Sequence, residues 1–319
     1  MKIVNFIKLT RPLNLLIIIF LQCIIKIFLI DQFIEESALT NFNFSLFLLS
    51  TVLITAAGYI INDIYDEKID EINKNDSRII NKKIKSSNAI AWYIAFNIIS
   101  LILILYVAWQ IQKPIFSLIF IYSIFLLWKY SKELKTKFLR GNIVVSWLIA
   151  LSIINLALFD VIPVLRNDNS SIIIFKVIII YAVFSFLMTL SREIIKDTED
   201  KDGDQIQNAK TLIIQLGLEK TKIVINAINL LVLTLVACWQ YFQYSLSLTS
   251  FENDQKIEIW GTDFNSIIYT CVLQVFLLFL IMKTFYAKSK EDFSFISRLS
   301  KIIMIIGILS IIVFTKNFI

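Results

Sequence analysis

Nine long apolar segments constrain what this chain can fold into. A transmembrane helix needs about 20 mainly apolar residues to cross the hydrocarbon core of a bilayer. A window of that length predicts nine spans, over residues 12–30, 44–61, 89–110, 113–131, 142–162, 172–191, 221–244, 264–286 and 299–315. Apolar residues make up 57% of the chain, against roughly 45–50% in a soluble domain. The sequence therefore predicts an all-α, multi-spanning membrane protein, with residues 1–319 forming a single membrane-embedded domain.

The basic residues alternate between the two sides of the predicted membrane. Of the 31 lysines and arginines, 25 fall in the N-terminal segment and in every second loop. Lys and Arg accumulate in cytoplasmic loops, so we expect the N-terminus and these loops in the cytoplasm, with the chain in the cell (inner) membrane of a prokaryote. The net charge of +6 then reflects topology and contact with anionic membrane lipids. It does not indicate a nucleic-acid partner.

The residue types that are missing limit the chemistry. The chain has no histidine, which excludes histidine-based acid–base catalysis and histidine metal ligands. Cys23, Cys238 and Cys271 lie inside apolar segments without CxxC spacing, as expected for small packing side chains. Any reaction must therefore use carboxylates, Lys, Arg, Tyr or Asn.

Two acidic motifs share one spacing. Each has three aspartates at positions i, i+3 and i+7, in predicted cytoplasmic loops at about 62–88 and 192–220: Asp63, Asp66 and Asp70, then Asp197, Asp200 and Asp204. This spacing puts each set on one helical face, where like charges repel. A divalent cation would offset the repulsion, and all-oxygen ligands select Mg²⁺ or Mn²⁺. Two such faces predict a metal-bridged phosphate or diphosphate; solvated loop charges are the alternative.

The motifs resemble those of a known family. The pattern Asn62-Asp63-x-x-Asp66-x-x-x-Asp70 is similar to the NDxxDxxxD motif of the UbiA superfamily of intramembrane prenyltransferases, and Asp197 to Asp204 resembles its second aspartate motif. The nine spans agree with the family's nine helices around a central cavity. The resemblance implies Mg²⁺-dependent transfer of a prenyl group from a prenyl diphosphate to an acceptor. The six aspartates would hold two Mg²⁺ ions, with Mn²⁺ as an alternative.

Further side chains receive expected roles from this resemblance. We expect diphosphate contacts from Asn62, Arg78, Lys135, Arg192 and Lys196. The candidates for acceptor binding are Asn14, Lys26, Tyr130 and Asn142. For the cations the alternative is ordinary interfacial charge. For Lys26, which lies inside the first apolar segment, it is a side chain that reaches the membrane surface.

The acceptor stays open between two classes. The segments 57–63 and 192–200 resemble the geranylgeranylglycerol-phosphate geranylgeranyltransferase branch, which implies a geranylgeranyl donor and a lipid-like acceptor. Ile213 in place of a common proline, and a Tyr130 to Lys135 spacing one residue longer than YxxxK, are departures that leave room for 4-hydroxybenzoate or dihydroxynaphthoate. A cation-coupled transporter is a third hypothesis, which the one-sided acidic residues and scarcity of Gly and Pro disfavour.

Overall fold

The structure is a computed structural model that describes residues 2–67, 80–81, 83–165, 169–206, 208–252 and 260–316. Within these ranges nine helical segments are long and apolar enough to cross a membrane, and no named strand occurs. The predicted all-α, multi-spanning fold is confirmed. In lipid this is the expected solution, because a helix satisfies its own backbone hydrogen bonds.

The nine spans contain one long helix each. Their bounds are α2 (Pro12–Ile25), α4 (Asn41–Tyr65), α6 (Ser86–Gln110), α7 (Leu118–Lys129), α8 (Arg140–Leu156), α9 (Asn169–Glu199), α11 (Leu212–Glu252), α12 (Phe264–Tyr286) and α13 (Lys290–Thr315). Short helices are α1 (Lys2–Leu9), α3 (Asp31–Phe33) and α10 (Lys201–Ile206). One-turn π-helical segments extend three spans: Lys26–Ile30 after α2, Tyr130–Leu134 after α7 and Ala157–Val161 after α8.

Several helices extend beyond the apolar segments that predicted them. The span expected over 172–191 continues helically to Glu199. Helical hydrogen bonds then run from Asp200 N to Lys196 O (2.9 Å) and from Asp204 N to Asp200 O (3.1 Å). Hydropathy marks only the part of a helix inside hydrocarbon, whereas backbone bonding continues into the interface. Much of the predicted loop 192–220 is therefore helical.

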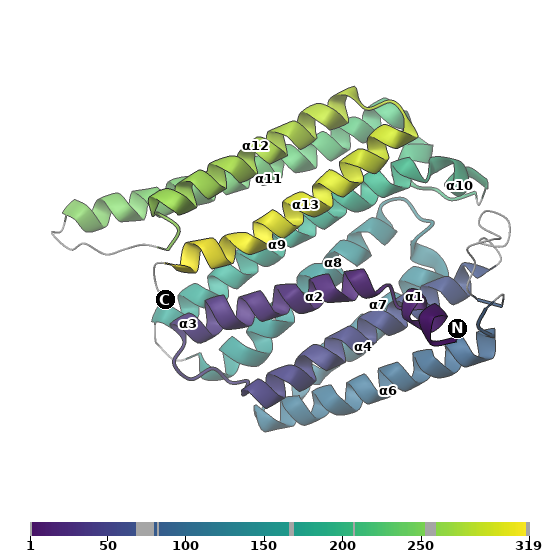
Figure 1. Cartoon of the computed structure of the whole chain (residues 1–319), viewed down its shortest axis with the longest axis horizontal. Helices are drawn as coiled ribbons and strands as arrows, with labels where there is room; N and C mark the ends of the chain where they lie inside the picture. The colour runs from purple at the N-terminus through teal and green to yellow at the C-terminus, as the bar shows by residue number, and fades with distance from the viewer. Residues whose placement is uncertain are drawn as a thin grey trace.

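The helices pack in two groups that α9 joins (Figure 1). In one group α4 packs against α6 and α7, with the rings of Phe47, Phe120 and Phe159 within 5.2–5.9 Å of one another. In the other, α11, α12 and α13 pack together, while α9 contacts α8, α11 and α13. The C-terminal ends of α4 and α9 lie at the same end of the bundle, which we call the motif end.

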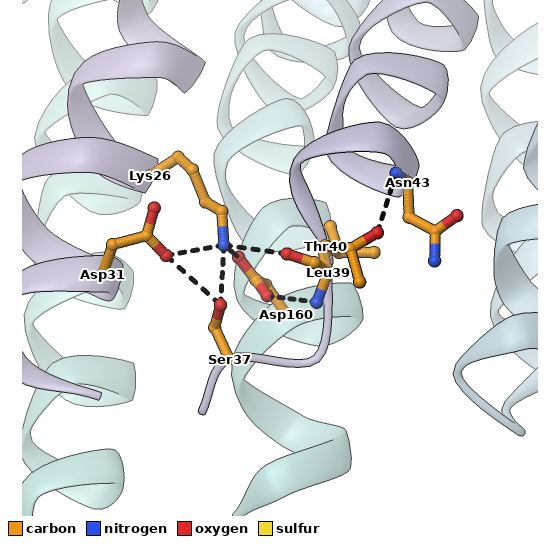
Figure 2. Close-up of polar contacts among 7 residues, drawn as sticks. All are labelled: Lys26, Asp31, Ser37, Leu39, Thr40, Asn43 and Asp160. Carbon is orange, nitrogen blue, oxygen red and sulfur yellow. Dashed lines mark hydrogen bonds and ion pairs between the residues drawn. The ribbon is translucent and has the colours of Figure 1, made fainter. Parts of the chain in front are cut away.

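A buried ion pair lies toward the opposite end of the helical bundle and connects several segments there (Figure 2). Lys26, only 2% exposed, places its Nζ 2.9 Å from Asp160 Oδ2 and 2.7 Å from Asp31 Oδ1. The ammonium also donates to Ser37 Oγ (2.7 Å) and to the Leu39 carbonyl (3.1 Å). Leu39 N in turn donates to Asp160 Oδ1 (2.7 Å). Asp160 therefore anchors both Lys26 and the connection that leads into α4.

This geometry corrects the expectation for Lys26. The connection around Leu39 leads into the first turn of α4, and the first acidic motif begins in the last turn of that helix. A helix of that length spans about 37 Å, so Lys26 lies at the end remote from the motifs. Its ammonium is also held by two carboxylates. Lys26 therefore leaves the predicted acceptor set. Its side chain is buried within the bundle, whereas the alternative supposed one that extends to the surface.

We predict that Asp160→Asn destabilises the protein. The change leaves the buried Lys26 ammonium with only the Asp31 carboxylate, whose side chain is 39% exposed. Losing one member of a buried pair costs about 3 kcal/mol, measurable as a lower unfolding temperature in detergent. Asp31→Asn is the matched control and should cost about 1 kcal/mol or less. Equal losses in the two variants would contradict the assignment.

Candidate active site

The first acidic motif sits where α4 ends. Asp63 occupies the last helical turn, and Asp66 follows the helix with its backbone N bonded to Asn62 O at 2.9 Å. The helix thus presents two of the three predicted aspartates at the motif end. Asp70 and the predicted diphosphate contact Arg78 lie outside the described residues.

Cations from elsewhere in the chain hold both of these carboxylates. Arg11 Nη2 lies 3.0 Å from Asp63 Oδ1, and Lys135 Nζ is paired with Asp66 Oδ1. Asn62 Nδ2 also donates to Asp66 Oδ2 at 2.8 Å. These groups come from residues far apart in sequence. The tertiary fold therefore concentrates positive charge on the first motif.

The second acidic motif is positioned by α9 and α8. Asn142, at the start of α8, donates from Nδ2 to Asp197 Oδ2 at 2.8 Å. The preceding Gly141 makes this approach feasible, because a Cβ there would lie 2.8 Å from the Lys135 Cα. Asn142 thus contacts the second motif and Lys135 the first. The close backbone contact between Gly141 and Lys135 brings these two predicted residues together.

Tyr130 lies where the two motifs meet. Its phenol interacts electrostatically with Asp66 of the first motif and with Asp197 and Glu193 on α9. Tyr130 also begins the π-helical turn that ends α7, in which Lys135 N bonds to Tyr130 O at 3.2 Å. A π turn holds one residue more than an α turn. It therefore absorbs the extra residue in the Tyr130 to Lys135 spacing.

Sequence reasoning missed Glu193 and Arg11 as site residues. Glu193 lies one turn before Asp197 on the same face of α9, with a side chain 14% exposed. It pairs with Arg192 Nη1 at 3.1 Å and with Lys196 Nζ at 3.7 Å. The i−4 spacing from Asp197 was a usable signal for Glu193. For Arg11 the sequence offered only its place in the opening Arg11-Pro12-Leu13-Asn14 segment.

The donor chemistry of these residues fits a hard divalent cation. The available ligands are carboxylate and amide oxygens, which suit Mg²⁺. The Asn62 Oδ1 atom is buried and has no hydrogen-bond partner within the described part of the chain. No group of three acidic side chains converges in that part. Cation pairing with Arg11 and Lys135 shows instead that the carboxylates of the first motif attract positive charge.

Asp204 titrates in an unusual range. Burial and the neighbouring negative charge of Asp200 raise the pKa of Asp204 to about 6, although the nearby Thr211 side chain acts in the opposite direction. Below that pH the carboxyl holds its proton, and above it the group is an anion. A proton and a metal ion would therefore compete for Asp204 close to neutral pH.

We predict that Mg²⁺ binding weakens at least tenfold between pH 7 and pH 5, because protonation removes Asp204 as a ligand. Calorimetric titration of the detergent-solubilised protein would measure this. Asp204→Asn should reduce the pH dependence. Asp202→Asn, an exposed neighbour in α10, should leave it unchanged. Equal affinities at both pH values in the unaltered protein would exclude Asp204 as a ligand.

Fold and site together define a polytopic membrane protein with two aspartate motifs at one end of its helical bundle. Residues 32–251 match the sequence model of the UbiA prenyltransferase family. The chain belongs to that family.

Several relatives share one name. The digeranylgeranylglyceryl phosphate synthase of Saccharolobus solfataricus is 39% identical over 173 residues, which are 53% of this chain and 55% of the relative. The chain thus spans about half the length of that relative. The synthase of the same name from Methanosphaera stadtmanae is 28% identical over 273 residues, covering 85% of this chain and 87% of the relative.

Solved structures share the fold over nearly the whole chain. One, described as giving insights into the biosynthesis of digeranylgeranylglyceryl phosphate synthase in membranes, has a TM-score of 0.70 at 24% identity and covers 99% of both chains. A UbiA homologue from Archaeoglobus fulgidus, bound to DMAPP and Mg²⁺, has a TM-score of 0.60 at 15% identity. It covers 97% of this chain and 99% of that one. At these identities the likeness concerns the fold.

Proposed function

We propose that this protein transfers a geranylgeranyl group from geranylgeranyl diphosphate to geranylgeranylglycerol phosphate and releases diphosphate. The observation that carries the proposal is the meeting of the two aspartate motifs around Tyr130 at one end of a membrane-embedded bundle. The names of the relatives support the lipid-like acceptor. The homologue bound to DMAPP and Mg²⁺ supports a prenyl diphosphate donor.

The aspartates are assigned to the metal ions in this proposal. Two Mg²⁺ ions would be held by Asp63, Asp66, Asp70, Asp197, Asp200 and Asp204. Bound there, Mg²⁺ supplies Lewis-acid stabilisation for the negative charge on a leaving diphosphate. Residues 1–319 would act as one membrane-embedded unit, with the motif end in the cytoplasm of a prokaryote, as the distribution of Lys and Arg favours.

The diphosphate contacts come from cations beside the motifs. Lys135, Lys196 and Arg78 would bind diphosphate oxygens, together with the amide of Asn62. Arg11 and Lys135, which pair with Asp63 and Asp66, can exchange those carboxylates for diphosphate oxygens. Such preorganised charges stabilise the negative charge that develops on the leaving group.

Transfer breaks one bond and forms another. The bond between C1 of the prenyl group and the diphosphate oxygen breaks, and its electrons stay on the diphosphate. The acceptor's glycerol hydroxyl bonds to C1, and its proton passes to a carboxylate. Glu193, beside Tyr130 and outside the repeated aspartate spacing, is the base we propose. Tyr130 and Asn142 would orient the acceptor hydroxyl between the two motifs.

We predict Mg²⁺-dependent transfer by the purified protein in detergent, with diphosphate release equal to ether formation. Asp200→Asn should lower kcat/KM at least about a hundredfold, because it removes charge stabilisation from the transition state. Asp202→Asn is the matched control and should keep near-normal activity. Full activity of Asp200→Asn would refute the metal assignment. Transfer only to 4-hydroxybenzoate or dihydroxynaphthoate would replace the lipid acceptor with an aromatic one.

A further inference from the structure

An apolar cavity lies on the opposite side of α9 from the aspartate face. It is enclosed by α9, α11, α12 and α13, with Leu21 of α2 and Ile153 of α8 completing the wall. Met188 on α9 lies nine residues before Asp197, which places the two side chains about 180° apart around the helix. This cavity is therefore separate from the space that the aspartates face.

Polar side chains line the part of the cavity remote from the motifs. Tyr181 on α9 and Ser310 on α13 line it, and their hydroxyls are hydrogen-bonded at 2.7 Å. The Trp260 ring packs against Tyr181 (centroids 6.4 Å apart) and donates from Nε1 to Thr315 Oγ1 at 3.1 Å. The lining is dominated by aliphatic and aromatic side chains. This shape and chemistry suit the end of an isoprenoid chain.

Three of the enclosing helices place a polar side chain just beyond the cavity, toward the motif end. Asn14 lies seven residues from Leu21 on α2. Arg192 lies four residues from Met188 on α9, and Lys301 lies three residues from Met304 on α13. These spacings keep each polar residue on the helical face that lines the cavity. The apolar cavity therefore leads up to a polar rim, formed by Asn14, Arg192 and Lys301.

The rim carries an excess of positive charge. Lys301 Nζ lies 3.5 Å from Asn14 Oδ1, and Lys301 is close enough to Arg192 and Lys196 to feel their charges. In the described part of the chain, Glu193 is the carboxylate that pairs with Arg192 and Lys196, and no ion pair links Lys301 to an acidic side chain. Within the same described residues, the buried Nε of Arg192 has no hydrogen-bond partner. Lys301, a partly buried cation with no ion pair in the described residues, therefore favours binding of an anion beside Arg192.

The rim is also connected to the first aspartate motif. The Asn14 side chain lies close to the Tyr59 phenol on α4. The Arg11 guanidinium, which pairs with Asp63, lies over the Tyr59 ring at 4.9 Å. An anionic headgroup on the rim would therefore be held beside the reacting end of the site, while its chain entered the cavity.

We infer that this rim and cavity form the binding site for the acceptor lipid, with Lys301 as a phosphate-binding residue. The inference rests on the proposed function and specifies its acceptor site. Lys301, Arg192 and Asn14 bind the phosphate, and the cavity binds the isoprenoid chain. Arg192 was expected to contact the diphosphate. It lies about 140° around α9 from Asp197, so we assign it to the acceptor phosphate, and the donor chain occupies the aspartate side of α9.

The first test separates acceptor binding from donor binding in steady-state kinetics. Lys301→Met should raise the KM for geranylgeranylglycerol phosphate about ten- to a hundredfold, as expected for a lost charge-assisted hydrogen bond. The KM for geranylgeranyl diphosphate should stay within about twofold. Lys301→Arg should restore most of the affinity. Arg298→Met, which removes an exposed cation from the same helix, should change neither constant. An unchanged acceptor KM in Lys301→Met would overturn the assignment.

The second test fills the cavity. Gly307 lines the cavity, and a Cβ added there meets no atom within 4 Å, so Gly307→Leu should fill part of the cavity. It should raise the KM for geranylgeranylglycerol phosphate but not for a shorter geranyl analogue. If the donor KM rises instead, the cavity holds the donor chain and the inference is wrong. No change for either substrate would also overturn it.

Direct binding distinguishes this inference from the proposed function. Native mass spectrometry of the unaltered protein, without donor or Mg²⁺, should show bound geranylgeranylglycerol phosphate and much weaker binding of the dephosphorylated lipid. Lys301→Met should lose this preference. If the lipid binds in this way but no transfer occurs, the proposed function fails and the lipid site stands. If the phosphorylated lipid is not preferred, the lipid site fails whatever the activity.

Discussion

Hydrocarbon cannot solvate a charge or an unpaired backbone group, and the arrangement of this protein follows from that constraint. Long helices satisfy the backbone. Charged side chains then have two options, to gather at the helix ends or to pair inside the bundle. Lys26 and Asp160 pair inside the bundle. Asp160 also binds Leu39 N, which links the connection before α4 to the end of the α8 span. Most of the remaining charge, including both aspartate motifs, is left for the ends.

The motif end is held together by alternating charges. Both motifs begin in the last turn of a long helix, where the helix dipole adds partial negative charge to that of the carboxylates. Cations from the α1–α2 and α7–α8 connections offset this negative charge. Arg11 pairs with Asp63, and Lys135 pairs with Asp66. In the proposed function the same pairs would prepare the site for an anion bridged by metal ions, since each cation could exchange its carboxylate for a phosphate oxygen.

The two faces of the central helix α9 carry different kinds of side chains. One face carries Glu193 and Asp197. The other carries Arg192 above an apolar cavity that Tyr181 and Ser310 help to line. The proposed reaction joins two isoprenoid lipids, so it would require two long chains to be kept apart while their polar ends meet. A helix with one face toward each chain would meet that requirement, with Asn14 and Tyr59 close together between the two sides.

The sequence by itself determined the class of fold and the two motifs, because spans depend on local hydropathy and the aspartates on short spacings within one helix. Even the extra residue between Tyr130 and Lys135 was visible, although only the π turn explains how it is accommodated. The tertiary structure alone decided that Lys26 pairs with Asp160, that Arg11 reaches Asp63, and that Lys301 stands above a cavity shared by six helices. These are contacts between residues up to 287 positions apart. No local pattern encodes such contacts, because they depend on how whole helices pack.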